Sequence, residues 1–165
     1  MSAFSYINIQ NIYEKTLSLS KDDGKALCAV MEQIKRDNDA IYWAGIYLLS
    51  DQVLYLGPYA GPKTEHLEIP VGRGVCGTAV AVGKNQNISD VSSVENYLAC
   101  NLETKSELVV LVYHPSDQKT ILGQIDIDAT KLSSFDADDE KTLETVAALI
   151  APSVLRLNDA RIAKF

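Results

Sequence analysis

Residues 106–128, SELVVLVYHPSDQKTILGQIDID, predict a β-hairpin, and this hairpin decides the fold class. The runs 106–113 and 120–128 are rich in β-branched and aliphatic residues, which favour strands. The polar segment 115–118 between them begins with a proline and predicts the turn. Two strands joined by so short a connection pair antiparallel, so we expect a largely antiparallel sheet.

The second strand of this hairpin carries an unusual pair of acids. Asp126 and Asp128 alternate with isoleucines, so both carboxylates project from the same face of the strand. Glu107 heads the preceding strand, and the turn can bring it near the pair. If that face meets solvent, the acids form a solvated edge. If it lines a cleft, they form a site for an ammonium group or a proton donor, and close like charges raise the pKa of at least one member.

The other elements place helices around this sheet. A second hairpin is expected from strands at 41–49 and 53–59. Further elements are expected as helices at 9–19, 20–37, 75–82 and after Asp136, and as short strands at 66–69 and 86–90. Helices at both ends of a mostly antiparallel sheet predict an α+β fold. No linker or repeat is visible, so residues 1–165 are expected to form a single domain.

Three local signals concern the ends of helices. Ser20, followed by Asp23, resembles a capping box and predicts that the second helix starts there. Asp136 is expected to cap the last helix, whose first turn is acidic. Pro152 predicts a kink or a break near the end of that helix.

Composition excludes several functional classes. The chain has 15 basic and 22 acidic residues and a formal net charge of -7, which disfavours contact with nucleic acid. No apolar stretch is long enough to span a bilayer, and the N-terminal residues lack the pattern of a secretory signal. We therefore expect a cytoplasmic protein that binds neither nucleic acid nor a membrane.

Three cysteines, an odd and low count, argue against a structural disulfide framework. Cys100 lies in the longest irregular stretch, 91–104, where it is either a reactive thiol or a small buried hydrophobe. Cys76 falls in the first turn of the short helix, where backbone N–H groups, the helix dipole and Arg73 favour a thiolate. The alternative is that the neighbouring glycines serve close packing and Cys76 is inert.

The aromatic residues and the possible cofactor motifs give weaker signals. Trp43 and Tyr47 share a face if their strand is regular, as part of the core or as a wall around a small ligand. The two histidines, His66 and His114, have no zinc-site spacing with the cysteines, so no metal is expected. The glycine motif 72–77 lacks the βαβ context of a dinucleotide site.

Taken together and in order, several stretches resemble the free methionine-(R)-sulfoxide reductases, a family of GAF domain proteins. The matching stretches are 42–47, 56–59, 69–79, 98–100, 104–109 and 123–128. The resemblance implies a GAF-like fold and reduction of free L-methionine-(R)-sulfoxide by a thiol mechanism. It implies that Cys100 attacks the sulfur and that Glu107 protonates or hydrogen-bonds the sulfoxide oxygen.

The resemblance also implies roles for the other candidate residues. It implies that Asp126 and Asp128 hold the amino acid, and that Trp43 and Tyr47 line the methyl end of the pocket. No cofactor is implied beyond a thioredoxin-like or small-thiol reductant, and the family resemblance suggests a homodimer.

The segment just before the glycine motif departs from the family pattern, as do the residues on either side of 98–100, where 95–97 replace the family's Gly-His and Asn101 replaces its acidic residue. The family carries a resolving cysteine in a Lys-x-x-Cys segment, whereas this chain has Lys63-Thr64-Glu65-His66. Cys76 matches a second family cysteine, and a disulfide between Cys76 and Cys100 would replace the missing bridge. Two alternatives to the reductase remain: a non-catalytic GAF sensor for a small ligand, favoured by this departure, and a dimerisation module.

Overall fold

A six-stranded antiparallel sheet forms the centre of the molecule. The structure is a computed structural model that describes residues 1–98 and 102–163. The strands are β1 (Ile41–Ser50), β2 (Val53–Ala60), β3 (Glu68–Pro70), β4 (Gln86–Ile88), β5 (Ser106–His114) and β6 (Asp117–Ala129). They lie in the order β3-β2-β1-β6-β5-β4, and every neighbouring pair is antiparallel. The expected antiparallel sheet is confirmed.

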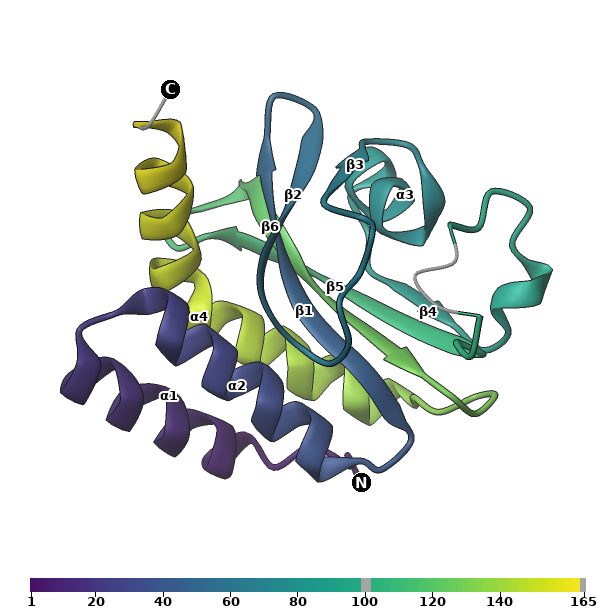
Figure 1. Cartoon of the computed structure of the whole chain (residues 1–165), viewed down its shortest axis with the longest axis horizontal. Helices are drawn as coiled ribbons and strands as arrows, with labels where there is room; N and C mark the ends of the chain where they lie inside the picture. Colours follow the sequence, from purple (N-terminus) through teal and green to yellow (C-terminus); the bar gives the residue numbers. More distant parts are fainter. Residues whose placement is uncertain (99–101, 164–165) are drawn as a thin grey trace.

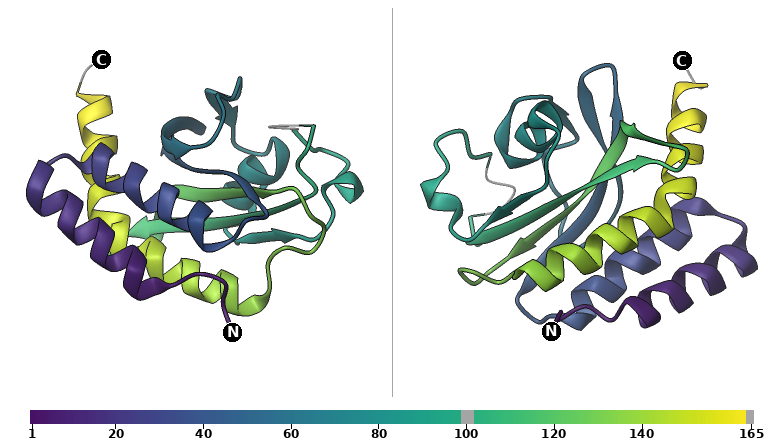
Figure 2. Two further views of the ribbon diagram at one scale, coloured as in Figure 1. Left: turned by 60° about the horizontal axis from the view of Figure 1, so that its bottom comes forward. Right: turned by 180° about the vertical axis from the view of Figure 1, so that it is seen from behind.

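Helices cover the two faces of this sheet unequally. They are α1 (Tyr6–Ser20), α2 (Asp23–Asp37), α3 (Gly74–Val82), the 3-10 turn η1 (Val91–Ser93) and α4 (Ala137–Ile162). Figures 1 and 2 show α2 and α4 against one face, α1 packed outside them, and the short helix α3 alone on the opposite face. The α+β class predicted from the order of elements is therefore confirmed.

Alternation along the strands gives each face its own hydrophobic core. On β5 and β6 the side chains of Leu108, Val110, Ile125 and Ile127 pack with α1, α2 and α4. The residues between them turn to the face that α3 covers, where the apolar members include Val109 and Leu111. Because the period of a strand is two, the buried isoleucines of β6 force the acids between them onto the α3 side.

The helical layer is joined by polar contacts as well as by apolar packing. The Ser153 hydroxyl of α4 lies 2.7 Å from the Tyr13 hydroxyl of α1. Arg156 forms a salt bridge of 2.7 Å with Asp23 at the start of α2. The Arg156 guanidinium is also the main cause of the lowered pKa of Asp23. These contacts fix α4 against both N-terminal helices.

Two of the predicted helix ends need comment. The second helix begins at Asp23, and its N-cap is Asp22, whose side chain accepts a hydrogen bond from the Lys25 amide. The prediction of a cap at Ser20 was wrong because α1 extends through that residue. The cap at Asp136 is confirmed as a reciprocal capping box with Asp139.

Pro152 lies inside α4, which continues to Ile162. Figure 1 shows the helix changing direction between its green and yellow parts, so the predicted kink is present and the chain does not break. After the bend, the last part of α4 reaches the ends of β1 and β6. There the Asn158 side chain donates hydrogen bonds to the carbonyls of Leu49 and Leu122. None of the helices in the described ranges has the length and apolar character of a membrane span.

Gly123 marks the tightest approach between β6 and β1. A Cβ at this position would overlap the Tyr47 carbonyl oxygen, which is backbone and cannot rotate away. We expect Gly123→Ala to lower the free energy of unfolding by about 1–3 kcal/mol, the usual cost of overpacking. Urea denaturation measures this, with Gly24→Ala in α2 as the control, because a Cβ there meets only the Asp22 side chain. An unchanged midpoint for Gly123→Ala would contradict the close contact.

Candidate functional site

Three acids lie together on the face of the sheet that α3 covers. Glu107 on β5 is directly opposite Asp128 on β6, and Asp126 is two residues further along the same face. All three side chains are buried, with 2%, 0% and 0% exposure respectively. The sequence left open whether these acids formed a solvated edge. Their burial excludes that reading.

A row of side chains runs across the sheet through this cluster. Trp43 on β1 pairs with Asp128, which pairs in turn with Glu107. The next row on the same face holds Gly45 and Asp126. A Cβ on Gly45 would overlap the Trp43 indole, so glycine allows that ring to lie across the strand. The register thus places the indole beside the carboxyl groups.

The α3 helix adds a thiol to the acids. The Sγ atom of Cys76 lies 3.9 Å from Oε1 of Glu107, and one ligand atom from each of Cys76, Glu107 and Asp126 lies within 4.8 Å of the others. Cys76 is in the first turn of α3, as predicted, and is 4% exposed. It is therefore neither an isolated core thiol nor an open surface thiol.

Two glycines explain how α3 comes so close. Gly74 begins the helix with a φ of 64°, a conformation that favours glycine. A Cβ on Gly77 would lie 2.5 Å from the Pro70 carbonyl oxygen, so only glycine lets the first turn pack against the end of β3. The glycine motif at 72–77 therefore positions Cys76 over the sheet.

Burial dominates the electrostatics of the acids. It raises the pKa of Glu107 well above its usual range, and the charges of Asp126 and Asp128 add to this effect. Burial likewise raises the pKa of Asp128, with a contribution from the neighbouring Asp126. For Asp126 burial raises the pKa to about 6, and contacts with Cys76 and Glu107 oppose a larger rise. The cluster can therefore hold protons near neutral pH.

The aromatic residues form one wall of the site. Trp43 and Tyr47 have ring centroids 6.1 Å apart, so they share a face as predicted. The Trp43 ring also stacks on Tyr59, with centroids 5.6 Å apart. The Trp43 indole N–H is buried without an acceptor in the described part of the chain, so it is free to donate to a ligand. Tyr59 was not among the predicted site residues, because its place on the wall depends on the pairing of β1 with β2.

The predicted nucleophile, Cys100, lies outside the described residues. Leu98, the last described residue before it, lines a cavity of about 10 Å³ together with Cys76 and Glu107. The Asn96 side chain donates a hydrogen bond of 2.9 Å to the carbonyl of Gly72, just before α3. The chain that leads toward Cys100 is thus attached to the α3 end of the site.

His66, at the position where the family pattern expects a cysteine, also belongs to the surroundings of the site. Its carbonyl oxygen accepts a hydrogen bond of 3.0 Å from the Tyr47 hydroxyl. An electrostatic interaction with its imidazole lowers the pKa of Asp126, against the larger effect of burial. The sequence predicted that the strand starts at His66, but β3 begins at Glu68, so His66 lies just before the strand.

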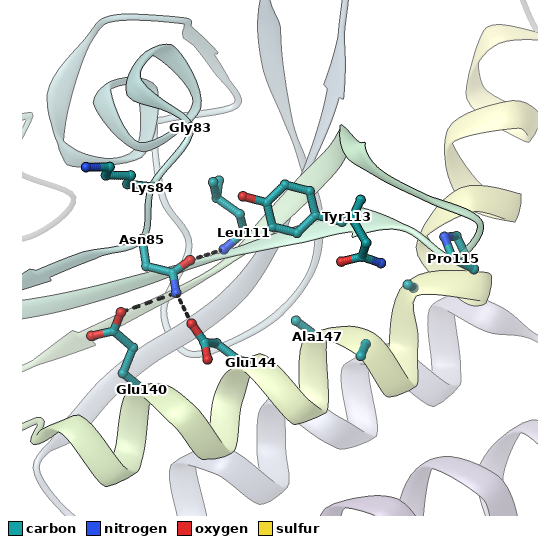
Figure 3. Close-up of a pocket in the computed structure, with 12 residues that line it drawn as sticks. Gly83, Lys84, Asn85, Leu111, Tyr113, Pro115, Glu140, Glu144 and Ala147 are labelled. Carbon is teal, nitrogen blue, oxygen red and sulfur yellow. Dashed lines mark hydrogen bonds between the residues drawn. The ribbon is translucent and has the colours of Figure 1, made fainter.

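A larger cavity than the one beside Cys76 lies elsewhere among the described residues. A groove of about 720 Å³ opens between the free edge of β5, the end of α3 and the alanines of α4. Figure 3 shows Asn85 bridging it: its side-chain amide donates to Glu140 and Glu144 and accepts from the Leu111 amide. The residues that line this groove include no cysteine and none of the buried acids of the cluster beside Cys76, so the groove is separate from that cluster.

The raised pKa of Asp126 predicts how stability depends on pH. A carboxyl with a raised folded pKa stabilises the fold in its protonated form, and this contribution is lost as pH rises through about 6. Wild type should therefore lose up to about 3 kcal/mol from this group between about pH 4 and pH 6.5, whereas Asp126→Asn should not.

Thermal denaturation of both proteins across this range measures the difference, with the exposed Asp117→Asn as control. The advantage of Asp126→Asn should grow with pH. An advantage that shrinks with rising pH would contradict the assigned direction.

Comparison with known proteins identifies relatives of this chain. The GAF domain model matches residues 24–154. Free methionine-R-sulfoxide reductase of Escherichia coli (strain K12) is 44% identical over 108 residues, covering 66% of this chain and 63% of that protein. The enzyme of the same name from Saccharomyces cerevisiae is 42% identical over 116 residues, covering 68% and 63%. The match thus spans less than two thirds of either relative.

A solved structure agrees with these relatives. The type II free methionine-R-sulfoxide reductase from Thermoplasma acidophilum superposes with a TM-score of 0.73 at 36% identity, covering 87% of this chain and 94% of that one.

Proposed function

The chain belongs to the GAF domain family and, within it, to the free methionine-R-sulfoxide reductases, and we propose that it reduces free L-methionine-(R)-sulfoxide to methionine. The observation that carries this proposal is the buried cluster of Glu107, Asp126 and Asp128 beside the Cys76 thiol and the Trp43 ring. Sulfoxide reduction needs a proton donor for the departing oxygen and a thiol, and this cluster supplies both kinds of group.

Cys100 is the proposed nucleophile. Its thiolate attacks the sulfoxide sulfur, and the sulfur–oxygen bond breaks as the oxygen passes to the cysteine. The substrate leaves as a thioether, reduced by two electrons, while Cys100 becomes a sulfenic acid, oxidised by two electrons. Glu107 is suited to protonate the oxygen, because its raised pKa keeps it protonated in the buried cluster.

The remaining groups fit the substrate's two ends. Asp126 and Asp128, when ionised, would attract the substrate ammonium group, since opposite charges attract strongly away from water. Trp43, with Tyr47 and Tyr59 around it, offers an apolar wall for the methyl end. This assignment explains why acids and aromatic rings share one face of the sheet.

Cys76 is the proposed resolving thiol. Its sulfur would attack the sulfenic acid of Cys100, releasing water and forming a disulfide. A dithiol reductant of the thioredoxin type would then return both residues to thiols by exchange. Disulfide formation requires the two Cα atoms to come within about 7 Å.

Turnover of the two separated sulfoxide isomers tests the proposal. With dithiothreitol as reductant, wild-type protein should convert the R isomer of the free amino acid to methionine, measured by chromatography, and leave the S isomer. Dithiothreitol removes any dependence on a protein reductant. No conversion of the R isomer would refute the proposed activity.

The second candidate function is a non-catalytic sensor for a small amino acid. It is favoured by His66, which stands where the family pattern has a resolving cysteine. Calorimetric binding of methionine sulfoxide without formation of methionine would support the sensor and exclude the reductase.

A further inference from the structure

The buried cluster has the composition of a metal site as well as of a catalytic one. It combines one thiol and three carboxyl groups from three different elements, α3, β5 and β6. No zinc-site spacing appears in the sequence, because the residues are 76, 107, 126 and 128 and meet only through the fold. All four residues belong to a helix or a strand.

The two aspartate side chains of the cluster lack well-placed hydrogen-bond donors among the described residues. No hydrogen-bond donor of the described residues meets the carboxyl oxygens of Asp126 or Asp128 with good geometry, and both residues are completely buried. No lysine or arginine in the described ranges forms an ion pair with Glu107, Asp126 or Asp128. A buried polar group without a partner costs free energy, so a cation placed among these oxygens would stabilise the protein.

We propose that this cluster binds a zinc ion through Cys76, Glu107 and Asp126, and that the ion blocks the site. Zinc accepts thiolate and carboxylate ligands in a tetrahedral arrangement, at about 2.3 Å from sulfur and about 2.0–2.2 Å from oxygen. Such an arrangement places ligand sulfur and oxygen about 3.6 Å apart. The observed separation of Cys76 Sγ and Glu107 Oε1 is 3.9 Å, and the full set lies within 4.8 Å.

The surroundings also suit one small ion. The cavity between Cys76 and Glu107 has a volume of about 10 Å³, about the space that one water molecule needs. The thiolate favours zinc or cobalt over magnesium and calcium, which prefer oxygen ligands alone. Three protein ligands leave the fourth position for water, with Asp128 directly opposite Glu107 on the neighbouring strand.

Metal binding has a defined chemical consequence. The Cys76 thiol loses its proton when its sulfur bonds the ion, and the bound sulfur is no longer free to attack another sulfur. The ion also occupies the oxygens of Glu107 and Asp126. Zinc therefore acts here as an inhibitor and not as a cofactor. The inhibitory effect rests on the proposed reductase function, whereas the binding of zinc does not.

Cobalt titration of the reduced, chelator-treated protein tests the binding without any turnover. Co²⁺ should produce a near-ultraviolet thiolate-to-cobalt charge-transfer band that saturates at one ion per chain, and zinc should abolish it. Cys76→Ser should lose the band. Asp126→Asn should weaken cobalt affinity by about 10- to 100-fold or more, since even outer partners of metal ligands have effects of that size.

Cys28→Ser is the matched control, because Cys28 is the other cysteine in the described ranges and its sulfur contacts the Tyr59 carbonyl instead of the acids. It should keep the band. A band that is absent from wild type, or that is lost in Cys28→Ser and kept in Cys76→Ser, overturns the proposal.

Alkylation of wild type removes any dependence on the folding of the variants. Zinc should slow the labelling of Cys76 by iodoacetamide, read by peptide mass mapping, and leave Cys28 unchanged. Equal labelling of Cys76 with and without zinc overturns the site. If zinc binds and methionine sulfoxide is not turned over, the proposed reductase fails while the metal site stands. If turnover occurs and zinc does not bind, only the metal site fails.

Discussion

Glu107→Gln is expected to lower kcat/KM for free methionine-(R)-sulfoxide by about 10²- to 10⁴-fold, the usual contribution of a general acid. Glu107 is 2% exposed, and burial with two neighbouring acids raises its pKa well above the usual range. A glutamine keeps the size of the side chain and can donate a hydrogen bond, but it cannot transfer a proton to the departing oxygen. Steady-state kinetics with dithiothreitol measure the effect.

The control is Glu68→Gln on β3, an exposed glutamate that should leave the rate unchanged. The loss should appear mainly in kcat, since the proton is needed in the transition state and not for binding. A Glu107→Gln enzyme with wild-type kcat would remove Glu107 from the chemistry.

Cys100→Ser is expected to abolish turnover entirely. The serine hydroxyl is a poor nucleophile at neutral pH and cannot become a sulfenic acid. The attack on the sulfoxide therefore does not occur, and no disulfide with Cys76 can form. Substitutions of the other two cysteines should have smaller effects on turnover. Cys28→Ser should retain wild-type kinetics, because Cys28 lies on α2 and its thiol contacts the Tyr59 carbonyl, away from the cluster of acids.

Cys76→Ser should separate the attack of Cys100 on the sulfoxide from the later formation of the disulfide. It should still convert about one equivalent of sulfoxide without reductant, since the first step needs only Cys100, but should not form the internal disulfide. Wild-type rates for Cys100→Ser, or inactivity of Cys28→Ser in a folded protein, would contradict these roles.

Much of the fold followed from local patterns. The alternation of isoleucine and aspartate on β6 predicted both the strand and the common face of the acids, because side chains on a strand alternate with a period of two. The acidic first turn after Asp136 predicted the start of α4. Helix ends were less certain because several polar residues compete for the cap, and Asp22 rather than Ser20 caps α2.

The order of strands depended on contacts that are distant in sequence. β1 lies between β2 and β6, so Trp43 pairs with Asp128 across 85 positions of the chain. No periodicity carries that information. The same reason explains why Tyr59 was missed and why the separation of Cys76 from the acids could not be predicted: it depends on how closely Gly77 lets α3 approach β3.

The candidate site was predicted in part. Glu107, Asp126, Asp128, Trp43 and Tyr47 lie on one face of the sheet, and Cys76 lies on α3, which covers that face. The catalytic roles of these residues stay predictions, as does the role of Cys100. The sequence could not distinguish a solvated acid edge from a buried cluster, because that depends on α3 covering the face.

A single-turnover experiment without reductant tests the central claim most directly. Reduced wild-type protein is mixed with one equivalent of free methionine-(R)-sulfoxide, and methionine and the intact protein mass are measured together. The account predicts about one equivalent of methionine per chain and a protein lighter by two hydrogen atoms, with Cys76 and Cys100 joined in a disulfide. Formation of no methionine, with the protein mass unchanged, would contradict it.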